Sequence, residues 1–292
     1  MHVPVLTSEI LSFLPAKDDV RVVDGTLDGA GHAEAILRGH PNAQVLGIEW
    51  DPRMVEAMRE RYVSLGDKLT VVNESYTNME HICKEHSFVP DAVLLDLGLS
   101  SWHYVESGRG FSFLRDEPLD MRFNPERTEA TASDMVMTMD QSTLEDMLTK
   151  DGEERFAPEI AAAIIQQRRR EPILTTGQLV RVIEGAVPAW YRHRKIHCAT
   201  KTFQALRMRV NRELEAIDAG IDAALRTLER GGRLMVISFH GGEDKLVRER
   251  FKAAVREGKA KWVQRRTVRP SWKEVSDNPR ARSAKLKVIE IA

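Results

Sequence analysis

The sequence predicts an α/β fold in which helices cover a mainly parallel β-sheet that a helical insertion interrupts. Strand-like runs of β-branched and apolar residues alternate with helical runs through the first hundred residues, and this alternation is typical of βαβ units. Residues 103–199 then lack strand signals, and apolar strands resume only after them.

The first part of the chain predicts the core of the sheet. The expected strands cover residues 20–24, 44–49, 69–73 and 91–97, and the expected helices cover about 31–39, 52–64 and 77–86. The fourth strand is apolar until Asp96, as expected for a strand that is buried on both faces of a parallel sheet.

The insertion is predicted to be helical. Its helical runs are STLEDMLTKDG, APEIAAAIIQQRRR and TTGQLVRVIEGAV. The last run has Thr175 or Thr176 as its N-cap and ends near Pro188. We therefore expect residues 1–102 and 200–292 to form one discontinuous domain, interrupted by residues 103–199.

The sheet resumes after the insertion. Apolar residues from Phe203 to Leu228 recur every three or four positions and predict one long amphipathic helix that ends at Gly231. A buried strand, a helix and two antiparallel strands follow in RLMVISFH, EDKLVRERFKAAVRE, KWVQRRT and AKLKVIEI. Such an ending is typical of the Rossmann-like class I sheet of S-adenosylmethionine-dependent methyltransferases, whereas nicotinamide-binding domains usually continue with further βα units.

The stretch VVDGTLDGAGH, residues 22–32, combines a strand, a glycine-rich turn and a helix start. Such a turn lets backbone N–H groups approach a ligand. The next strand ends at Glu49, about twenty residues past the glycines, where a carboxylate can accept hydrogen bonds from a ribose. The turn therefore predicts a nucleoside-containing cofactor.

The glycine spacing distinguishes two such cofactors. Nicotinamide enzymes favour G-x-G-x-x-G, whereas this turn has G-x-x-x-G-x-G and follows Asp24. A carboxylate at Asp24 repels a pyrophosphate but suits the cationic amino acid of S-adenosylmethionine. We expect Gly31→Leu to abolish cofactor binding by filling the approach to the backbone.

Other candidate residues follow the strand ends. Tyr76 could stack on an adenine. Asp96 would be costly to bury without partners, so it should face the cleft near the cofactor or the nucleophile. His32 is expected at the helix start or on the cofactor, and His103 at the mouth of the same cleft. Neither histidine has a second ligand at metal-binding spacing, so no metal is expected.

Composition indicates a soluble, cytoplasmic protein. Two cysteines without a C-x-x-C motif favour a reducing compartment, and no segment resembles a signal peptide or a membrane span. The net charge is −1, yet cationic residues cluster at 168–170, 192–195 and 265–287. Three such clusters favour a phosphate-rich partner.

Several motifs together resemble one family. They are HVPVL at 2–6, DGTLDGAGH at 24–32, LLDLGLSS at 94–101, RGFSF at 109–113, PLDMRF at 118–123, GEERFAPEIAAAI, ATKTFQALRMRVNRELE, GGRLMVISFH and NPRARSAKL at 278–286. In this order they span nearly the whole chain. The sequence resembles the bacterial ribosomal RNA small subunit methyltransferase H family, the 16S rRNA cytosine-N(4) methyltransferases.

This resemblance implies methyl transfer from S-adenosylmethionine to the exocyclic N(4) amine of a cytidine in the decoding centre, at the P site of 16S rRNA. It implies cofactor contacts at Ala30, Gly31, His32, Glu49, Tyr76, Asp96 and His103. We expect Asp96 to be catalytic, Arg122 to help hold the target base, and Arg280 and Arg282 to bind rRNA. The insertion is then the substrate-recognition domain.

Some positions depart from the family pattern. Asp28 and Ala30 stand where glycine or another small or neutral residue is common, and Glu49 replaces the commoner aspartate. His103 replaces a frequent glutamine, and Tyr76 replaces phenylalanine but keeps the ring. The contacts of Ala30 and His103 are the least determined by the motif.

Other functions stay open at this point. A methyltransferase of the same fold could act on DNA or protein, and a non-catalytic ribosome assembly factor could retain the fold. The cofactor residues argue for an active enzyme. The sequence leaves the oligomeric state undecided, with a homodimer among the options.

Overall fold

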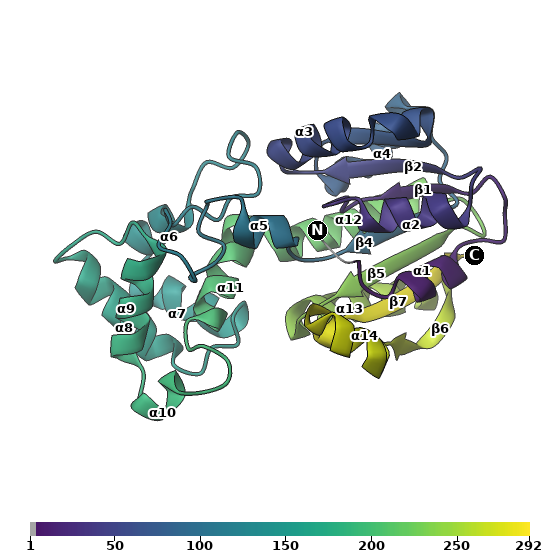
Figure 1. Cartoon of the computed structure of the whole chain (residues 1–292). Helices are drawn as coiled ribbons and strands as arrows, with labels where there is room; N and C mark the ends of the chain where they lie inside the picture. The colour runs from purple at the N-terminus through teal and green to yellow at the C-terminus, as the bar shows by residue number, and fades with distance from the viewer. Residues whose placement is uncertain (1–3) are drawn as a thin grey trace. The chain divides into compact units, whose positions relative to one another are not determined.

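The computed structural model describes residues 4–292 and contains a seven-stranded sheet with the order β3-β2-β1-β4-β5-β7-β6 (Figure 1). The strands are β1 (Arg21–Asp24), β2 (Gln44–Glu49), β3 (Leu69–Asn73), β4 (Ala92–Asp96), β5 (Arg233–Ser238), β6 (Ala260–Val268) and β7 (Lys285–Ile291). The first five strands pair in parallel, and β7 pairs antiparallel with β5 and β6. The predicted α/β methyltransferase sheet is confirmed.

Helices pack on both faces of this sheet. They are α1 (Thr7–Phe13), α2 (Gly31–Gly39), α3 (Pro52–Arg61), α4 (Met79–Glu85), α12 (Glu213–Thr227), α13 (Gly241–Arg256) and α14 (Trp272–Asp277). Successive strand residues point to opposite faces, so Val22 and Val23 lie in two different apolar clusters. Both clusters are buried, which explains why the central strands β1, β2, β4 and β5 are mainly apolar.

The structure divides into two compact units, residues 1–100 with 214–292, and residues 101–213. The second unit contains α5 (Ser101–Val105), α6 (Ala132–Thr138), α7 (Gln141–Lys150), α8 (Ala157–Arg168), α9 (Thr176–Ala186), α10 (Ala189–Arg192) and α11 (Thr200–Val210). The Thr175 side chain caps α9, as predicted, by accepting a hydrogen bond from the backbone N–H of Gln178.

The prediction of one long helix from Phe203 to Leu228 is wrong, because the chain forms two separate helices there, α11 and α12. Arg212 adopts a left-handed backbone with φ of 49°. The amide of Asn211 donates to the carbonyls of Met121 and Arg207 and accepts from the N–H of Phe123. The second unit therefore ends at 213 and not at 199, since α11 packs on α7 and α6.

Two short helices have no counterpart in the sequence prediction. They are α1 near the start of the described residues and α14 in the loop between β6 and β7. The carboxylate of Glu274 in α14 accepts a hydrogen bond from the backbone N–H of Leu6 at 2.6 Å, so the two helices support one another. Such short helices depend on tertiary contacts more than on their own sequences.

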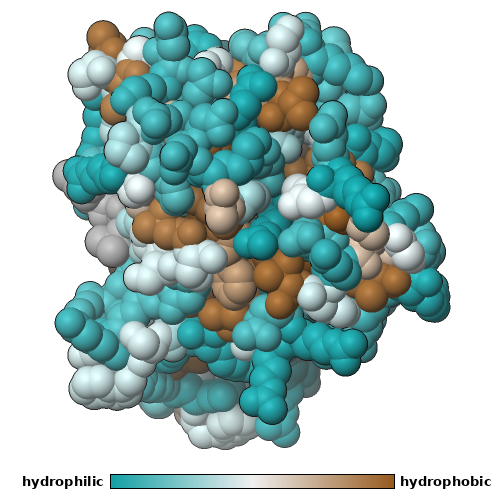
Figure 2. All heavy atoms as spheres, turned by 90° about the vertical axis from the view of Figure 1, so that its right-hand side faces the viewer, coloured by the Kyte–Doolittle hydropathy of each residue, from teal (hydrophilic) through white to brown (hydrophobic). Residues whose placement is uncertain are grey.

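The face of the molecule that Figure 2 shows is mainly polar. Hydrophilic side chains cover most of the face in Figure 2, and hydrophobic ones lie among them in small groups. Within residues 4–292, no helix combines the length and the apolar composition that crossing a membrane requires.

Candidate functional site

Three carboxylates lie at the carboxyl ends of neighbouring parallel strands. Asp24 ends β1, Glu49 ends β2 and Asp96 ends β4. Because β1 pairs with both β2 and β4, the three residues meet at one edge of the sheet. All three are buried. The structure thus brings these three predicted residues together at the edge where ligands of open α/β sheets bind.

The glycine-rich turn lies directly beside these carboxylates. Its first glycine, Gly25, is required by crowding, because a Cβ there would lie 2.5 Å from Cδ2 of Leu95. Asp28 and Ala30 have φ of 48° and 57°, a left-handed backbone that favours glycine. The turn is thus held in its shape although two non-glycine residues carry backbone strain.

The predicted role of Gly31 needs a different physical reason. A Cβ at Gly31 would lie 3.0 and 3.1 Å from Cδ and Cγ of Pro4, so this position faces the N-terminal segment. A larger residue would displace Pro4 first and would disturb the turn through that segment. The first two residues of the HVPVL motif, His2 and Val3, lie outside the described residues.

Ala30 offers little surface for a cofactor. Its side chain is buried in the apolar cluster that includes Ala33 and Ile36. Its N–H donates to the carbonyl of Leu27 at 2.7 Å, and its carbonyl accepts from the N–H of Glu34 at 2.8 Å. A cofactor contact at Ala30 is therefore restricted to the backbone and stays a prediction.

Glu49 is oriented by two backbone N–H groups. Its Oε1 accepts from the N–H of Asp51 at 2.8 Å, and its Oε2 accepts from the N–H of Asp28 at 2.9 Å. Each oxygen keeps a further lone pair for a hydroxyl donor. Burial raises the pKa of Glu49 to about 7, although these backbone hydrogen bonds oppose the shift. This arrangement suits a ligand with two adjacent hydroxyls.

Asp24, His32 and Asp96 form the second half of the site. The Nε2 of His32 lies 3.2 Å from Oδ2 of Asp96. Thr26 joins the two aspartates, because its hydroxyl accepts from the N–H of Asp96 and its own N–H donates to Oδ1 of Asp24. Thr26 was not among the predicted site residues, although its place two residues after Asp24 in the turn was a usable signal.

Three buried atoms in this group lack a hydrogen-bond partner within residues 4–292. They are Oδ2 of Asp24, Oδ1 of Asp96 and Nδ1 of His32. Native structures leave few buried polar atoms unpaired, so a ligand is the natural partner. The two free oxygens suit a cation such as an ammonium group.

The electrostatics of the site favour a cationic ligand. Burial raises the pKa of Asp24 to about 6, and the negative charge of Asp96 adds to the shift. Burial also raises the pKa of Asp28 well above its usual value, together with the charge of Glu49. For His32, burial is the largest single effect and lowers the pKa, but the hydrogen bond to Asp96 and the negative charges of Asp96 and Asp24 together outweigh burial and leave the pKa raised. A positive ligand would relieve this clustering of carboxylates.

Tyr76 begins a short 3₁₀-helix, η2 (Tyr76–Asn78), after β3. Its ring packs closely on Gly220 of α12, where a Cβ would lie 2.4 Å from two ring carbons. The ring is partly buried. One role of Tyr76 is therefore packing between η2 and α12, and the stacking of an adenine stays a prediction.

The structure places His103 and Arg122 in the second unit. His103 is buried among the rings of Trp102, Phe111 and Phe123, with centroid distances of 5.4, 5.2 and 5.2 Å. These contacts account for its burial through packing. Its predicted cofactor contact stays a prediction.

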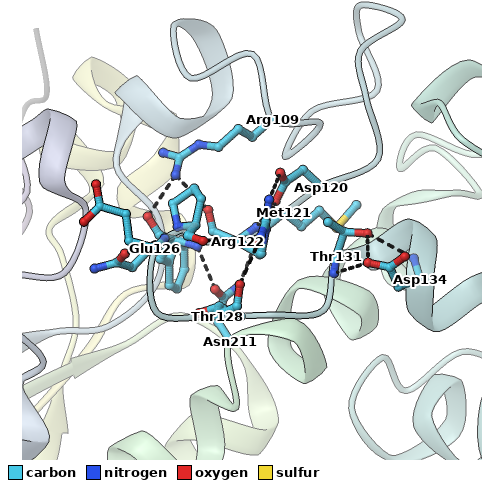
Figure 3. A network of polar contacts seen from close by, with 12 residues as sticks. Arg109, Asp120, Met121, Arg122, Glu126, Thr128, Thr131, Asp134 and Asn211 are labelled. Atoms are coloured by element: carbon cyan, nitrogen blue, oxygen red, sulfur yellow. Dashed lines mark hydrogen bonds and ion pairs between the residues drawn. The ribbon is translucent and has the colours of Figure 1, made fainter.

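Arg122 anchors the loop in which it lies (Figure 3). Its Nε and Nη2 donate to the carboxylate of Asp120 at 2.7 and 2.8 Å, and its Nη1 donates to the carbonyl of Thr128 at 3.0 Å. The Nη1 of Arg109 donates to the carbonyls of Arg122 and Phe123 at 2.8 Å each. This role of Arg109 could not be predicted from the sequence, because its partners are thirteen and fourteen residues away.

Arg280 and Arg282 lie on η3 (Pro279–Ser283), and both are exposed. Ala281 between them is fully buried, so the alternation holds the two arginines at the surface. This placement suits contact with a polyanion. It does not bring them into the carboxylate cluster.

One group of side chains in the described residues has the spacing of metal ligands. Atoms of Glu184, His197 and Cys198 lie within 4.8 Å of one another. Nδ1 of His197 accepts from the N–H of Ala199 at 3.2 Å, so a neutral ring carries its hydrogen on Nε2, which lies 3.5 Å from Oε1 of Glu184. Both ring nitrogens of His197 are thus engaged by contacts within the chain, and we assign no metal to the group.

The strain at Asp28 leads to a testable prediction. We expect Asp28→Gly to raise the free energy of unfolding of the cofactor-free protein by about 1 kcal/mol, since the left-handed backbone costs an L-residue about 1–2 kcal/mol and glycine gives part of this back as unfolded-state entropy. Urea unfolding measures the change. Asp28→Ala is the matched control, because it removes the carboxylate but keeps the Cβ. Equal free energies of unfolding for the Gly and Ala variants would contradict the claim that the backbone at Asp28 is strained.

Comparison with known proteins adds the family context. The model of the MraW methylase family matches residues 1–292. A ribosomal RNA small subunit methyltransferase H from Dehalococcoides mccartyi is 40% identical over 99% of this chain and 86% of its own length. Proteins of the same name from Desulfotalea psychrophila and Syntrophobacter fumaroxidans are 41% and 37% identical, over 99% of this chain and 98% and 96% of their own lengths.

Proposed function

Because this chain belongs to the MraW methylase family, we propose that it transfers a methyl group from S-adenosylmethionine to the exocyclic N(4) amine of a cytidine in the decoding centre (P site) of 16S rRNA. The carrying observation is the family match over the full length, together with an intact set of carboxylates at the strand ends. Relatives that share the match are named as methyltransferases of the small-subunit RNA.

The buried groups fit S-adenosylmethionine. The unpartnered oxygens of Asp24 and Asp96 would hold its ammonium group, and Glu49 would accept hydrogen bonds from its ribose hydroxyls. A pyrophosphate would instead face several negative charges here. When bound, this cofactor supplies an electrophilic methyl group on a positively charged sulfur.

The cytosine amine is a poor nucleophile, because its lone pair is delocalised into the ring. Holding the amine in line with the methyl group can lower the barrier by about 7–11 kcal/mol in favourable cases. Oδ1 of Asp96 has two lone pairs, so beside the ammonium group of the cofactor it can also accept a hydrogen bond from the amine and then its proton. His32 keeps Asp96 oriented through the other oxygen.

The RNA must present its target base unstacked, because the buried carboxylates are out of reach of a base in a helix. Exposed cations in the C-terminal loop would bind the surrounding phosphates. We place Arg280 and Arg282 among these contacts. Arg122 would act indirectly, by holding the loop of residues 118–128 through its bonds to Asp120 and Thr128.

Replacing Arg280 and Arg282 by alanine should weaken binding to rRNA and reduce the slope of log affinity against log salt by about 1.4–1.8, the value for two lost phosphate contacts. Filter binding over a range of salt concentrations measures the slope. Cofactor affinity should stay unchanged. The matched control replaces two other exposed cations, Lys245 and Arg248 on α13. An equal loss in both double variants would mean that only net charge matters.

The direct test maps methylated cytidines in 16S rRNA by mass spectrometry, from cells with and without the protein. We expect one decoding-centre cytidine to lack its N(4) methyl group in cells without the protein. Expression of the wild-type protein in the cytoplasm should restore this methyl group. Methylation of duplex DNA or of protein in place of small subunits would support another acceptor. Unchanged rRNA methylation would overturn the proposal.

A further inference from the structure

The loop between β6 and β7 carries a tryptophan at its surface. Trp272, the first residue of α14, is 85% exposed, whereas Trp190 in the other unit is 54% exposed. A single exposed apolar side chain needs no explanation. The surroundings of Trp272 give it a specific meaning.

Cationic side chains surround Trp272 in the sequence. Residues 265–282 contain six Lys and Arg residues and two carboxylates, a net charge of +4 in a chain of net charge −1. Arg265, Arg266, Arg269 and Lys273 are all exposed. Within residues 4–292, none of these four forms an ion pair with a carboxylate. The segment therefore presents positive charge that no carboxylate in the described chain neutralises.

The edge strand directs two of these cations outward. The pairing of β6 with β7 shifts between Gln264 and Val268, which oppose Val288 and Leu286. β6 therefore has extra residues here, and Arg265 and Arg266 lie in this bulge. Bulges change the direction of side chains at sheet edges.

Two contacts fix the position of α14. The hydroxyl of Ser271 accepts from the N–H of Glu274 at 3.1 Å, and Oε1 of Glu274 accepts from the N–H of Leu6 at 2.6 Å. The residue after Ser271 is Trp272, so the ring stands on an anchored turn. A backbone held in place reduces the loss of conformational entropy when the side chain that it carries binds a partner.

Charges on an edge strand also prevent sheets from aggregating. That role explains Arg265 and Arg266, but it does not explain an exposed tryptophan, which works against it. An exposed flat ring in a segment rich in unpaired cations is instead typical of surfaces that bind single-stranded nucleic acid, by stacking a base and attracting its phosphates.

We propose that Trp272 stacks an unpaired RNA nucleotide while Arg265, Arg266, Arg269 and Lys273 bind the adjoining phosphates. This inference rests on the proposed function, because the RNA is the rRNA substrate. It differs from the contacts of Arg280 and Arg282 in that the bound group is a base. Trp272 serves here in substrate binding, not in chemistry.

The experiment measures fluorescence anisotropy of a labelled single-stranded RNA of about 12 nucleotides, within the range of site sizes for such proteins. Trp272→Ala and Trp272→Leu should each weaken binding at least fivefold, about the effect of losing one stacked base, whereas Trp272→Phe should retain most of the affinity. The salt dependence should stay unchanged in all three variants, because no charge is removed. Val63→Ala, at a 74% exposed position of the same unit, is the control.

Each result decides between stacking and another contact. Wild-type affinity in Trp272→Ala would overturn the inference. Wild-type affinity in Trp272→Leu would show a general apolar contact in place of stacking and would also overturn the inference. Methyl transfer to small subunits by the wild-type protein is measured in the same preparations. Absence of this methyl transfer would count against the proposed function. Its presence, together with wild-type RNA affinity in the Trp272 variants, would overturn only the stacking by Trp272.

Discussion

Asp96→Asn should lower the rate of methyl transfer to small ribosomal subunits by at least about 100-fold, within the usual contribution of a general base. The substitution keeps the size of the side chain but removes its charge and its ability to take a proton. The free Oδ1 of Asp96 is buried at the strand end, and Oδ2 is held by His32. Steady-state transfer of a labelled methyl group measures the effect.

Two roles of Asp96 give different kinetics. Loss of a proton acceptor lowers kcat even at saturating S-adenosylmethionine, whereas loss of a cofactor ligand alone raises the KM for the cofactor. Asp67→Asn, an exposed position with the same change of charge, is the control. Full activity of Asp96→Asn would remove Asp96 from both roles.

Glu49→Gln should weaken S-adenosylmethionine binding by about 10–150-fold, the effect of losing hydrogen bonds to a charged group worth 1.5–3 kcal/mol. The variant should also change how binding depends on pH. The pKa of Glu49 is about 7 in the free protein, and ribose hydroxyls that donate to the carboxylate lower it. Wild-type binding therefore releases a proton below pH 7, and affinity rises with pH through this range.

Calorimetry in two buffers with different ionisation enthalpies measures the released protons. Glu49→Gln should release fewer protons than the wild type, and the release that remains should come from Asp24 and Asp28, whose pKa values are also raised by burial. Glu56→Gln, an exposed glutamate on α3, is the control. Equal proton release in wild type and Glu49→Gln would contradict the assignment.

The sheet could be predicted because buried parallel strands have a recognisable sequence pattern, a continuous run of apolar residues. The runs that end at Asp24, Glu49 and Asp96 are apolar without alternation, which is typical of strands covered on both faces. The carboxylates stand out against such runs. The candidate site therefore followed from the strand ends.

Other features depend on contacts that a sequence pattern does not contain. The apolar repeat from Phe203 to Leu228 continues through the break at Arg212, so periodicity alone predicted one helix. The environment of Gly31 could not be predicted because Pro4, far from it in sequence, fills that side of the turn. Arg122 was predicted to help hold the target base, whereas in the structure its guanidinium donates to the carboxylate of Asp120.

The carboxylate cluster affects how much of the folded protein a cell retains. Raised carboxyl pKa values mean that folding keeps protons which the unfolded chain gives up, so the cofactor-free protein loses stability as pH rises from about 4 to 7. A ligand that binds only the folded state restores stability in proportion to its concentration. Cells poor in methyl donor would thus degrade more of this enzyme, so its abundance would follow the nutrients from which the donor is made.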